Sequence, residues 1–356
     1  MLNIAFLCLE WPSAVHSGGV ARYAFRIATA LASHVNLTVV TFENGTPIDG
    51  VRMVYIARPK SRFGRFYLAP FRARSALRML DFDVLHSFGD DWALSRAGTP
   101  IIRTFLGSSL SEARSSLGLR KLNHYLLAAT ELVSKSSTKH RIAIGPDSYI
   151  RFDCHALMPP VVEVRRPTDV LSTIERSVVF VGSFAGRKRG WLVEDAVERA
   201  GRILGEHIQL TVIGPDTDVS SWRSTTTHIS GASDSEVIRT ISRAWVLMAP
   251  SLYEGFGIPV FEALSLSVPV VASSNPGTEY LRTLMGEGLA LKIVPDDNDF
   301  ASVLAQRLST RTDISEMEAA QVRHSISALL IQASPLRLLE EYEGVLRQAM
   351  AGGRRR

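Results

Sequence analysis

Residues 251–273 of the 356-residue chain read SLYEGFGIPVFEALSLSVPVVAS. This stretch sets Glu254 and Glu262 on either side of Gly-Phe-Gly-Ile-Pro in an otherwise apolar segment. Val246–Ala249, just upstream, is typical of a strand, so the quoted stretch should begin in the loop beyond that strand's carboxyl end, where open α/β sheets bind ligands. Pro259 suits the start of a helix, with Glu262 in its first turn.

Backbone N–H groups at the start of such a helix form an anion site, and glycine lets a ligand approach them closely. The backbone N–H groups expected to bind the anion are those of Gly255, Phe256, Gly257 and Ile258. A carboxylate repels phosphate but accepts hydrogen bonds from hydroxyls. Glu262 therefore suits a ribose diol and Glu254 a second sugar, as in a sugar nucleotide. The alternative is a capped helix whose acids complement its dipole.

The composition is that of a soluble globular protein, with 46% hydrophobic and 21% charged residues. Cys8 and Cys154 are too few and too far apart for a disulfide framework or a zinc site, which favours a reducing cytoplasm. The opening MLNIAFLCLEWP lacks the features of a signal peptide and is too short to span a bilayer. We therefore expect a cytoplasmic protein.

Short β-rich runs alternate with helical patterns along the whole chain, which predicts parallel sheets covered on both faces. We expect two facing doubly wound Rossmann-like domains, with boundaries at 1–165 and 166–334, and a C-terminal helix and basic tail at 335–356. Ser334 and Pro335 mark the start of that helix. It could complete the second domain or cross back to the first, and Gly352-Gly353 with the three terminal arginines is predicted to be a frayed tail. The expected strands are Ile4–Leu9, Leu37–Phe42, Val51–Ile56, Val84–His86, Ile101–Thr104, Ile142–Ile144, Val178–Val181, Leu210–Ile213, Val246–Ala249, Val268–Ala272 and Leu289–Val294.

A basic triplet, Arg187, Lys188 and Arg189, lies in the loop FVGSFAGRKRGW after one predicted strand. Cleaving a sugar–diphosphate bond leaves negative charge on the nucleotide, and positioned cations lower that barrier. The alternative is a solvated basic turn. Gly18 and Gly19 do not fit the dinucleotide fingerprint, so a nicotinamide site is unsupported.

Three segments resemble the retaining GT-B glycosyltransferases of the family-four group, which carry a Glu-x7-Glu motif: Trp11–Leu31, Asp81–Gly89 and Ile229–Ser273. The resemblance implies that Glu262 binds ribose and that Glu254, with the Gly255–Ile258 backbone, holds the transferred sugar and the phosphates. It also implies that Gly18 and Gly19 close over the diphosphate and that the loop from Ser230 to Ala232 contacts the base. Neither a dedicated nucleophile, nor a metal, nor a cofactor other than the donor sugar nucleotide is implied.

Two positions depart from the family pattern. Lys188 matches the family lysine, but Ser183 stands where the family has arginine, so Arg187 or Arg189 must substitute or the donor is held less tightly. Leu106 stands where the family commonly has a histidine. Candidates for an acceptor-side polar group are His16, His86 and Arg103. Asp297-Asn298-Asp299, which mimics a metal motif, and Gly89-Asp90-Asp91 are both predicted to be turns.

Ala57–Leu80 contains seven Lys/Arg residues and no acid, interleaved with aromatic and aliphatic side chains. This composition suits an anionic membrane surface or a lipid-linked diphosphate acceptor, and the alternative is a mobile basic loop. No nucleic-acid recognition motif accompanies the charge. Net charge is +5 overall, with 20 basic against 12 acidic residues in 1–165.

The sequence thus predicts a retaining glycosyltransferase that uses a UDP- or GDP-sugar, acts on a glycan, lipid-linked or small-molecule acceptor, and serves bacterial surface glycan or glycolipid assembly. Two alternatives are a nucleotide-sugar 2-epimerase, which shares the fold, and a catalytically silent subunit, suggested by Leu106 and Ser183.

Overall fold

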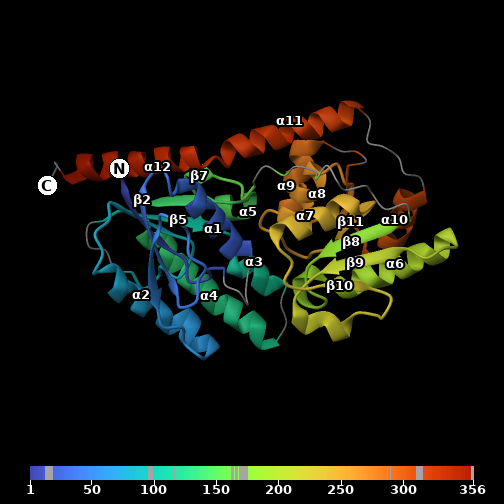
Figure 1. Ribbon diagram of the computed structural model, residues 1–356, viewed down its shortest axis with the longest axis horizontal. Helices are drawn as coiled ribbons and strands as arrows, with labels where there is room; N and C mark the ends of the chain where they lie inside the picture. Colours follow the sequence, from blue (N-terminus) through green and yellow to red (C-terminus); the bar gives the residue numbers. More distant parts are fainter. Residues whose placement is uncertain are drawn as a thin grey trace. The chain divides into compact units, whose positions relative to one another are not determined.

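The computed structural model describes residues 1–12, 19–94, 99–115, 118–161, 164, 167, 175–286, 288, 290–309 and 316–353 (Figure 1). The chain forms two compact units. The first comprises Met1–Ala113, Gly118–Pro160 and Gln332–Arg356, and the second is formed mainly by Val161–Ile331. The C-terminal segment therefore returns to the first unit, which decides between the two placements that the sequence left open.

The first unit contains a seven-stranded parallel sheet in the order β3-β2-β1-β4-β5-β6-β7. The interior strand β1 is mostly apolar and almost wholly buried, as expected for a strand covered on both faces. The strands are β1 (Asn3–Leu7), β2 (Asn36–Phe42), β3 (Arg52–Ile56), β4 (Val84–Ser87), β5 (Ile101–Phe105), β6 (His140–Ala143) and β7 (Ala156–Leu157).

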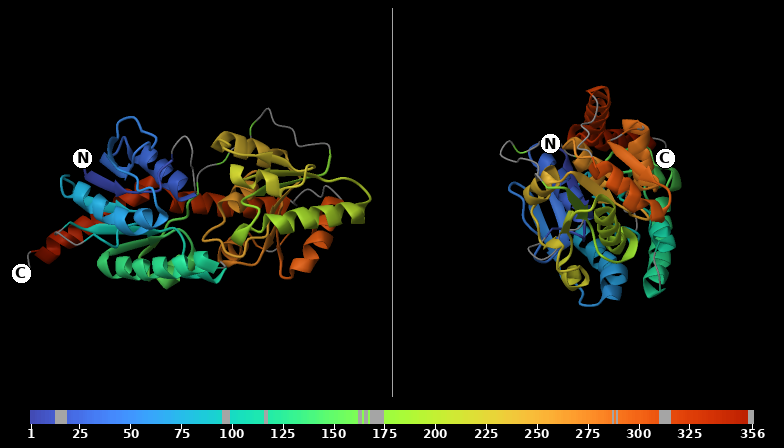
Figure 2. Two further views of the ribbon diagram at one scale, coloured as in Figure 1. Left: turned by 90° about the horizontal axis from the view of Figure 1, so that it is seen from below. Right: turned by 90° about the vertical axis from the view of Figure 1, so that its right-hand side faces the viewer.

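Helices lie on both faces of this sheet, as the left view of Figure 2 shows for α1 and α4. The arrangement follows from right-handed crossovers that run in opposite directions from the centre of the sheet. The helices are α1 (Gly19–Leu31), the π-helix η1 (Gly64–Leu68), α2 (Ala69–Leu77), α3 (Ser109–Arg114), α4 (Gly118–Ser137), α5 (Pro146–Arg151) and α12 (Pro335–Gly353).

Helix α12 begins at Pro335 as predicted and docks on the first unit through its apolar face. Leu338, Tyr342 and Val345 are buried there. The predicted end was wrong, because the helix continues through Gly352 and Gly353. The three terminal arginines lie outside the described residues.

The second unit contains a six-stranded parallel sheet in the order β10-β9-β8-β11-β12-β13. Its core gathers apolar residues of β8, β9, β11, α6 and α10. The strands are β8 (Ser177–Val181), β9 (Gln209–Ile213), β10 (Thr227–Ile229), β11 (Val246–Ala249), β12 (Val270–Ser273) and β13 (Leu291–Val294). The helices are α6 (Gly190–Leu204), α7 (Asp234–Arg243), α8 (Ile258–Ser265), α9 (Pro276–Met285), α10 (Phe300–Ser309) and α11 (Glu316–Gln332), with 3₁₀ turns η2 (Gly186–Lys188), η3 (Asp216–Ser221) and η4 (Asp297–Asp299).

Both sheets have a topological switch point, where neighbouring strands send their connections in opposite directions. In the first sheet it lies between β1 and β4, and in the second between β8 and β11. Ligands of open α/β sheets bind outside the carboxyl ends of the strands at such points. Each unit is therefore expected to bind its ligand outside the carboxyl ends of the two strands that flank its switch point.

The sequence missed β7 and β10, which are two and three residues long. Such short edge strands carry no hydrophobic run of their own, because pairing with a longer neighbour forms them. In the part of the chain that the structure describes, every helix is too short or too polar to cross a bilayer.

Candidate functional site

The loop after β11 leads directly into α8, as the sequence predicted. Gly257 is the N-cap of α8 with φ 91°, in the left-handed region that favours glycine, and Pro259 lies in the first turn. The N-cap Gly257 has no side chain that could cap α8, so a ligand could approach the first N–H groups of this helix. Glu262 is buried, but it lies just beyond the first turn in which it was predicted, because the helix begins at Ile258, one residue before Pro259.

Glu254 is held by two cations from the loop that follows β8. Its Oε1 lies 2.5 Å from Lys188 Nζ, and its Oε2 lies 3.2 Å from Arg187 Nη1. Burial opposes ionisation of Glu254, but Lys188 and Arg187 outweigh it and lower its pKa to about 2. The structure thus brings together all three residues predicted to be catalytic, at the switch point of the second sheet.

Arg187 also donates from Nη1 to the carbonyl oxygen of Tyr253, at 2.8 Å. The Leu252 N–H in turn donates to the carbonyl oxygen of Arg187. These bonds tie the loop after β8 to the loop after β11, so the positions of the cations and of Glu254 depend on each other.

Arg189, predicted to bind the donor, instead makes its hydrogen bonds within the second unit. It is buried with φ 55°, and its guanidinium donates to Pro250 O at 2.6 Å, Asp297 Oδ2 at 2.5 Å and Ser273 Oγ at 2.7 Å. It joins the ends of β11 and β12 to η4, and its guanidinium is occupied by these bonds. Asp297, in the segment that mimics a metal motif, lies in the predicted turn and serves as an ion-pair partner.

Asn275 is a supporting residue that the sequence reasoning missed. It caps α9 by accepting from the N–H groups of Gly277 and Thr278, and its Nδ2 donates to Ser251 O at 3.0 Å. Gly277 N–H donates to Glu254 O at 3.0 Å. The signal was present as Asn-Pro-Gly-Thr after a strand, which is typical of a capped helix start.

Ser230 and Ala232 follow β10, in the loop predicted to contact the base. Ser230 Oγ donates to Asp216 Oδ1 at 3.2 Å, Gly231 has φ 66°, and Ala232 is buried. Ser183, at the family arginine position, donates to Ala185 O at 2.9 Å and so stabilises its own loop.

His86, a candidate for the acceptor side, lies in the core of the first unit. Its Nδ1 is 2.7 Å from Tyr342 Oη and its Nε2 is 2.7 Å from Thr104 Oγ1. Burial, with His140, lowers the pKa of His86 to about 3. Both ring nitrogens are occupied, so His86 fixes α12 to the sheet, and the acceptor contact expected of it was wrong. Gly19 is the first residue of α1, while His16 and Gly18 lie outside the described residues.

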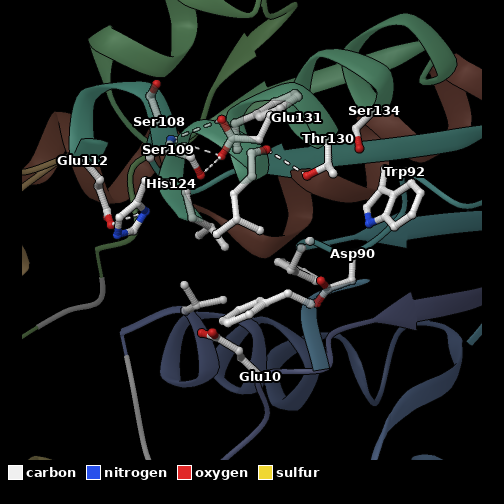
Figure 3. A pocket seen from close by; sticks show the side chains of 18 of the residues that line it. Glu10, Asp90, Trp92, Ser108, Ser109, Glu112, His124, Thr130, Glu131 and Ser134 are labelled. Carbon is white, nitrogen blue, oxygen red and sulfur yellow. Dashed lines mark hydrogen bonds and ion pairs between the residues drawn. The ribbon is translucent and has the colours of Figure 1, made fainter. Parts of the chain in front are cut away.

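A cavity of about 760 Å³ opens in the first unit at the carboxyl ends of β1, β4 and β5 (Figure 3). Leu106 and Arg103 line it. The guanidinium of Arg103 is ion-paired with buried Asp91 and lies 3.3 Å from Ser134 Oγ. The surface turn predicted for Gly89-Asp90-Asp91 was wrong, because Gly89 and Asp90 line this cavity and Asp91 is 1% exposed.

Two family models match the chain. The family described as Glycosyltransferase Family 4 matches residues 17–147, and the family described as Glycosyl transferases group 1 matches residues 175–310. The first match falls in the first unit and the second match in the second unit. Each unit therefore resembles one glycosyltransferase family model over less than half of the chain, and the two parallel-sheet units have the fold of the GT-B type.

Two relatives are similar to part of the chain, and several solved structures are similar to nearly all of it. MMP alpha-(1->4)-mannosyltransferase of Mycolicibacterium hassiacum is 27% identical over a stretch that covers 34% of this chain and 30% of the relative. O-antigen chain mannosyltransferase B of Escherichia coli is 34% identical over a stretch that covers 25% of this chain and 22% of the relative. The matched stretch thus spans less than a third of either relative.

Among solved structures, sucrose-phosphate synthase from Thermosynechococcus elongatus has a TM-score of 0.75 at 18% identity and covers 99% of this chain and 100% of its own. WaaG, a glycosyltransferase involved in lipopolysaccharide biosynthesis, has a TM-score of 0.73 at 18% identity, covering 96% and 100%. HepE from Anabaena, solved with UDP-glucose, has a TM-score of 0.68 at 11% identity, covering 98% and 100%. These likenesses establish the GT-B fold.

Proposed function

We propose that the chain is a glycosyltransferase that moves a sugar from a UDP- or GDP-sugar to an acceptor hydroxyl with retention of anomeric configuration. The observation that carries this proposal is the grouping of Glu254 with Lys188 and Arg187 beside the uncapped start of α8. The two mannosyltransferase relatives and the UDP-glucose bound in the HepE structure support a nucleotide-sugar donor. The O-antigen and lipopolysaccharide names support a role in bacterial surface glycan or glycolipid assembly.

The charges suit a diphosphate leaving group. Two cations face one ionised carboxylate, which leaves a net positive charge on this group, in the loops after β8 and β11 that precede α8. Because Glu254 already holds Lys188 in place, the cation needs no rearrangement when charge develops on the leaving phosphate. Glu262 binds the ribose hydroxyls, and Glu254 with the Gly255–Ile258 backbone holds the sugar and phosphates.

Retention follows from a front-face displacement. The acceptor oxygen forms its bond to the anomeric carbon as the bond to the phosphate oxygen breaks, and the acceptor's proton passes to that phosphate oxygen. No protein nucleophile takes part in this scheme. The cations of the loop after β8 stabilise the negative charge that develops on the leaving phosphate, and we propose that this step needs no metal. Activity that survives EDTA would support the last point.

The test is release of UDP or GDP from candidate donor sugars without acceptor, with the sugar product identified by NMR. Slow release of a free sugar of unchanged identity supports the transferase, whereas an epimer identifies a 2-epimerase. Binding without release, even once acceptors are supplied, identifies a silent subunit.

Variants separate the roles. Lys188→Ala and Glu254→Ala should lower kcat by about 10²–10³-fold with donor Kd nearly unchanged, because their interactions strengthen in the transition state. Glu262→Ala should instead weaken donor Kd by about tenfold or more, since hydrogen bonds to a charged group are lost. Lys292→Ala, an exposed lysine of β13, is the matched control. Equal losses of binding and turnover in all three variants would contradict these roles.

We also propose that the first unit contacts an anionic membrane through the basic segment 57–80. Residues 64–77 of this segment form η1 and α2, so most of the segment is helical and not a loop. Phe63 and Leu68 are exposed beside Arg62 and Arg65, and Tyr67 Oη donates to Asn123 Oδ1 of α4 at 3.2 Å.

Helix α4 extends this surface with exposed leucines at helical spacing, Leu119, Leu122 and Leu126, next to Arg120 and Lys121. Apolar side chains flanked by cations match the interface of an anionic bilayer. Sedimentation with phosphatidylglycerol-containing vesicles should retain the protein and release it as salt rises. Leu119→Ser/Leu122→Ser should abolish retention, whereas Ile331→Ser, at an exposed isoleucine of α11, should not; retention by neutral vesicles alone would contradict the proposal.

A further inference from the structure

On one side of the switch point of the second sheet, the strand ends offer main chain in place of side chains. β8 is followed at once by Gly182, β9 by Gly214, and β10 by Ser230 and Gly231. A Cβ on Gly182 would lie 3.0 Å from Lys188 Cβ, and a Cβ on Gly214 would lie 2.7 Å from the carbonyl oxygen of Gly182. These loops therefore pack closely through their backbones, and a flat ring can approach them without meeting a side chain at either glycine.

The same loops lie close to the proposed diphosphate site. The switch point falls between β8 and β11, and β9 and β10 follow β8 outward in the sheet. Neighbouring strands are about 4.8 Å apart, so the loops after β9 and β10 lie roughly 5–10 Å beyond the loop that holds Lys188. In a nucleotide sugar, the ribose separates the base from the diphosphate by a comparable distance.

In the opposite direction the strand ends are covered. Asn275, which follows β12, is buried, caps α9 and donates to the carbonyl oxygen of Ser251. A Cβ on Gly277 would lie 2.7 Å from the backbone of Phe256, so these two segments are packed together. A base attached to the diphosphate therefore finds accessible main chain beyond β8 and tightly packed residues beyond β11.

One carboxylate lies at the edge of the accessible main chain and is held in place. Ser230 Oγ donates to Asp216 Oδ1 at 3.2 Å, which joins the loop after β10 to the start of η3 after β9. The side chain of Asp216 is exposed, so its Oδ2 can accept from a ligand. The neighbouring Asp218 is already engaged, because its Oδ2 accepts from Phe184 N–H at 2.7 Å. Asp216 is thus the acid of η3 that is placed for recognition.

The two candidate bases present different groups to a carboxylate. Guanine has two adjacent N–H donors, on N1 and on the exocyclic N2, which match the two oxygens of a carboxylate. Asp216 Oδ1 can accept a second bond beside the one from Ser230, since each carboxylate oxygen has two acceptor positions. Uracil has one N–H donor, on N3, between two carbonyl oxygens, so pairing with a carboxylate places a carbonyl oxygen against negative charge. A carboxylate at this position therefore favours guanine.

We propose that the donor is a GDP-sugar and that Asp216, oriented by Ser230, selects guanine over uracil. The inference rests on the proposed glycosyltransferase function and deepens it by naming the class of donor. Guanine N1–H and N2–H donate to the two oxygens of Asp216, while the purine ring lies over the backbone at Gly182 and Gly214.

The test measures binding of free nucleoside diphosphates to the full chain by calorimetry. GDP should bind at least about tenfold more tightly than UDP, and about fivefold more tightly than inosine diphosphate, which lacks only the exocyclic amino group. Asp216→Asn should remove both preferences. This variant should instead prefer xanthosine diphosphate to GDP, because N1–H and O2 of xanthine match the oxygen and the N–H of an amide.

Asp299→Asn is the matched control, since it makes the same substitution at an exposed residue of η4, after β13. It should keep both preferences of the wild-type chain. Asp216 is exposed, so Asp216→Asn is expected to fold, and an unchanged thermal unfolding temperature checks this. UDP binding as tight as GDP binding in the wild-type chain would overturn the proposal, and so would a guanine preference that Asp216→Asn leaves intact.

Donor release in the same preparations separates base selection from the proposed function. Release of UDP from a UDP-sugar, with no preference for GDP, refutes guanine selection alone. GDP-selective binding without release from any GDP-sugar, even once acceptors are supplied, refutes the transferase function alone. Binding of neither GDP nor UDP overturns both.

Discussion

At the scale of single residues, neighbours in one loop have taken opposite roles. Lys188 and Arg189 are adjacent and both basic, but Lys188 meets Glu254 while Arg189 turns into the interior. The backbone of Arg189 lies in the left-handed region, with φ 55°. Sequence alone gave no means of separating the two, because charge and spacing are the same.

We predict that Arg189→Lys destabilises the chain by about 2–4 kcal/mol, since one ammonium cannot reproduce three divergent hydrogen bonds at a buried site. Urea unfolding would measure the loss. Arg202→Lys, at an exposed position of α6, should change stability by less than about 0.5 kcal/mol. Similar effects of the two variants would show that the interior bonds of Arg189 contribute little.

A second residue-scale prediction concerns Asp90. Its folded-state pKa is about 7, above the ordinary value of 3.8, so the folded chain holds a proton that the unfolded chain has lost between these pH values. Stability therefore falls as pH rises from about 4 to 7. Asp90→Asn should stabilise the chain by about 1–2 kcal/mol at pH 8 and by almost nothing at pH 4, measured by thermal unfolding. Asp49→Asn, at an exposed site, should show no such dependence; a flat response for Asp90→Asn would contradict the burial of its charge.

At the scale of elements, the candidate donor site depends on the contact between the start of α9 and the loop after β11. A Cβ on Gly277 would lie 2.7 Å from the backbone of Phe256 and 3.0 Å from Glu254 Cβ. This glycine is therefore required by close packing and not by its φ angle. Side-chain capping by Asn275 holds the two segments in register.

We predict that Gly277→Ala lowers donor turnover at least tenfold and destabilises the chain by about 1–3 kcal/mol, because the loop with Glu254 must shift. Gly344→Ala in α12 is the matched control, since its Cβ would meet no atom within 4 Å. It should stabilise the chain by about 0.5–1 kcal/mol through helix propensity. Calorimetry and donor release on both variants would check this, and full activity in Gly277→Ala would show that the loop tolerates displacement.

At the scale of the whole molecule, the last helix, α12, belongs to the first unit although it follows the second unit in the sequence. Buried Tyr342 meets His86 of β4, and Glu341 Oε2 lies 2.8 Å from His140 Nε2 of β6. The first unit is thus built from both ends of the chain, and its stability depends on residues more than 250 positions apart.

Tyr342→Phe should destabilise the first unit by about 1–3 kcal/mol, because it leaves a buried ring nitrogen of His86 without its partner. Hydrogen exchange should accelerate in α12 and β4 with little change in β8 and β11. Tyr149→Phe, at an exposed tyrosine of α5, serves as the control. Uniform acceleration in both units would instead mean that α12 stabilises them as one cooperative structure.

Local patterns in the sequence were enough to predict the two doubly wound units, the strands of both sheets to within about two residues except β7 and β10, and the choice of Glu254, Lys188 and Arg187 as site candidates. These features follow from local apolar runs and from the rule that ligands bind at the carboxyl ends of parallel strands. Only the tertiary structure decided that Arg189 and His86 face the interior, that Asp90 lines a cavity, and that α12 returns to the first unit. The physical reason is that burial and side-chain direction depend on backbone angles and on partners distant in sequence, which no local pattern of residue types contains.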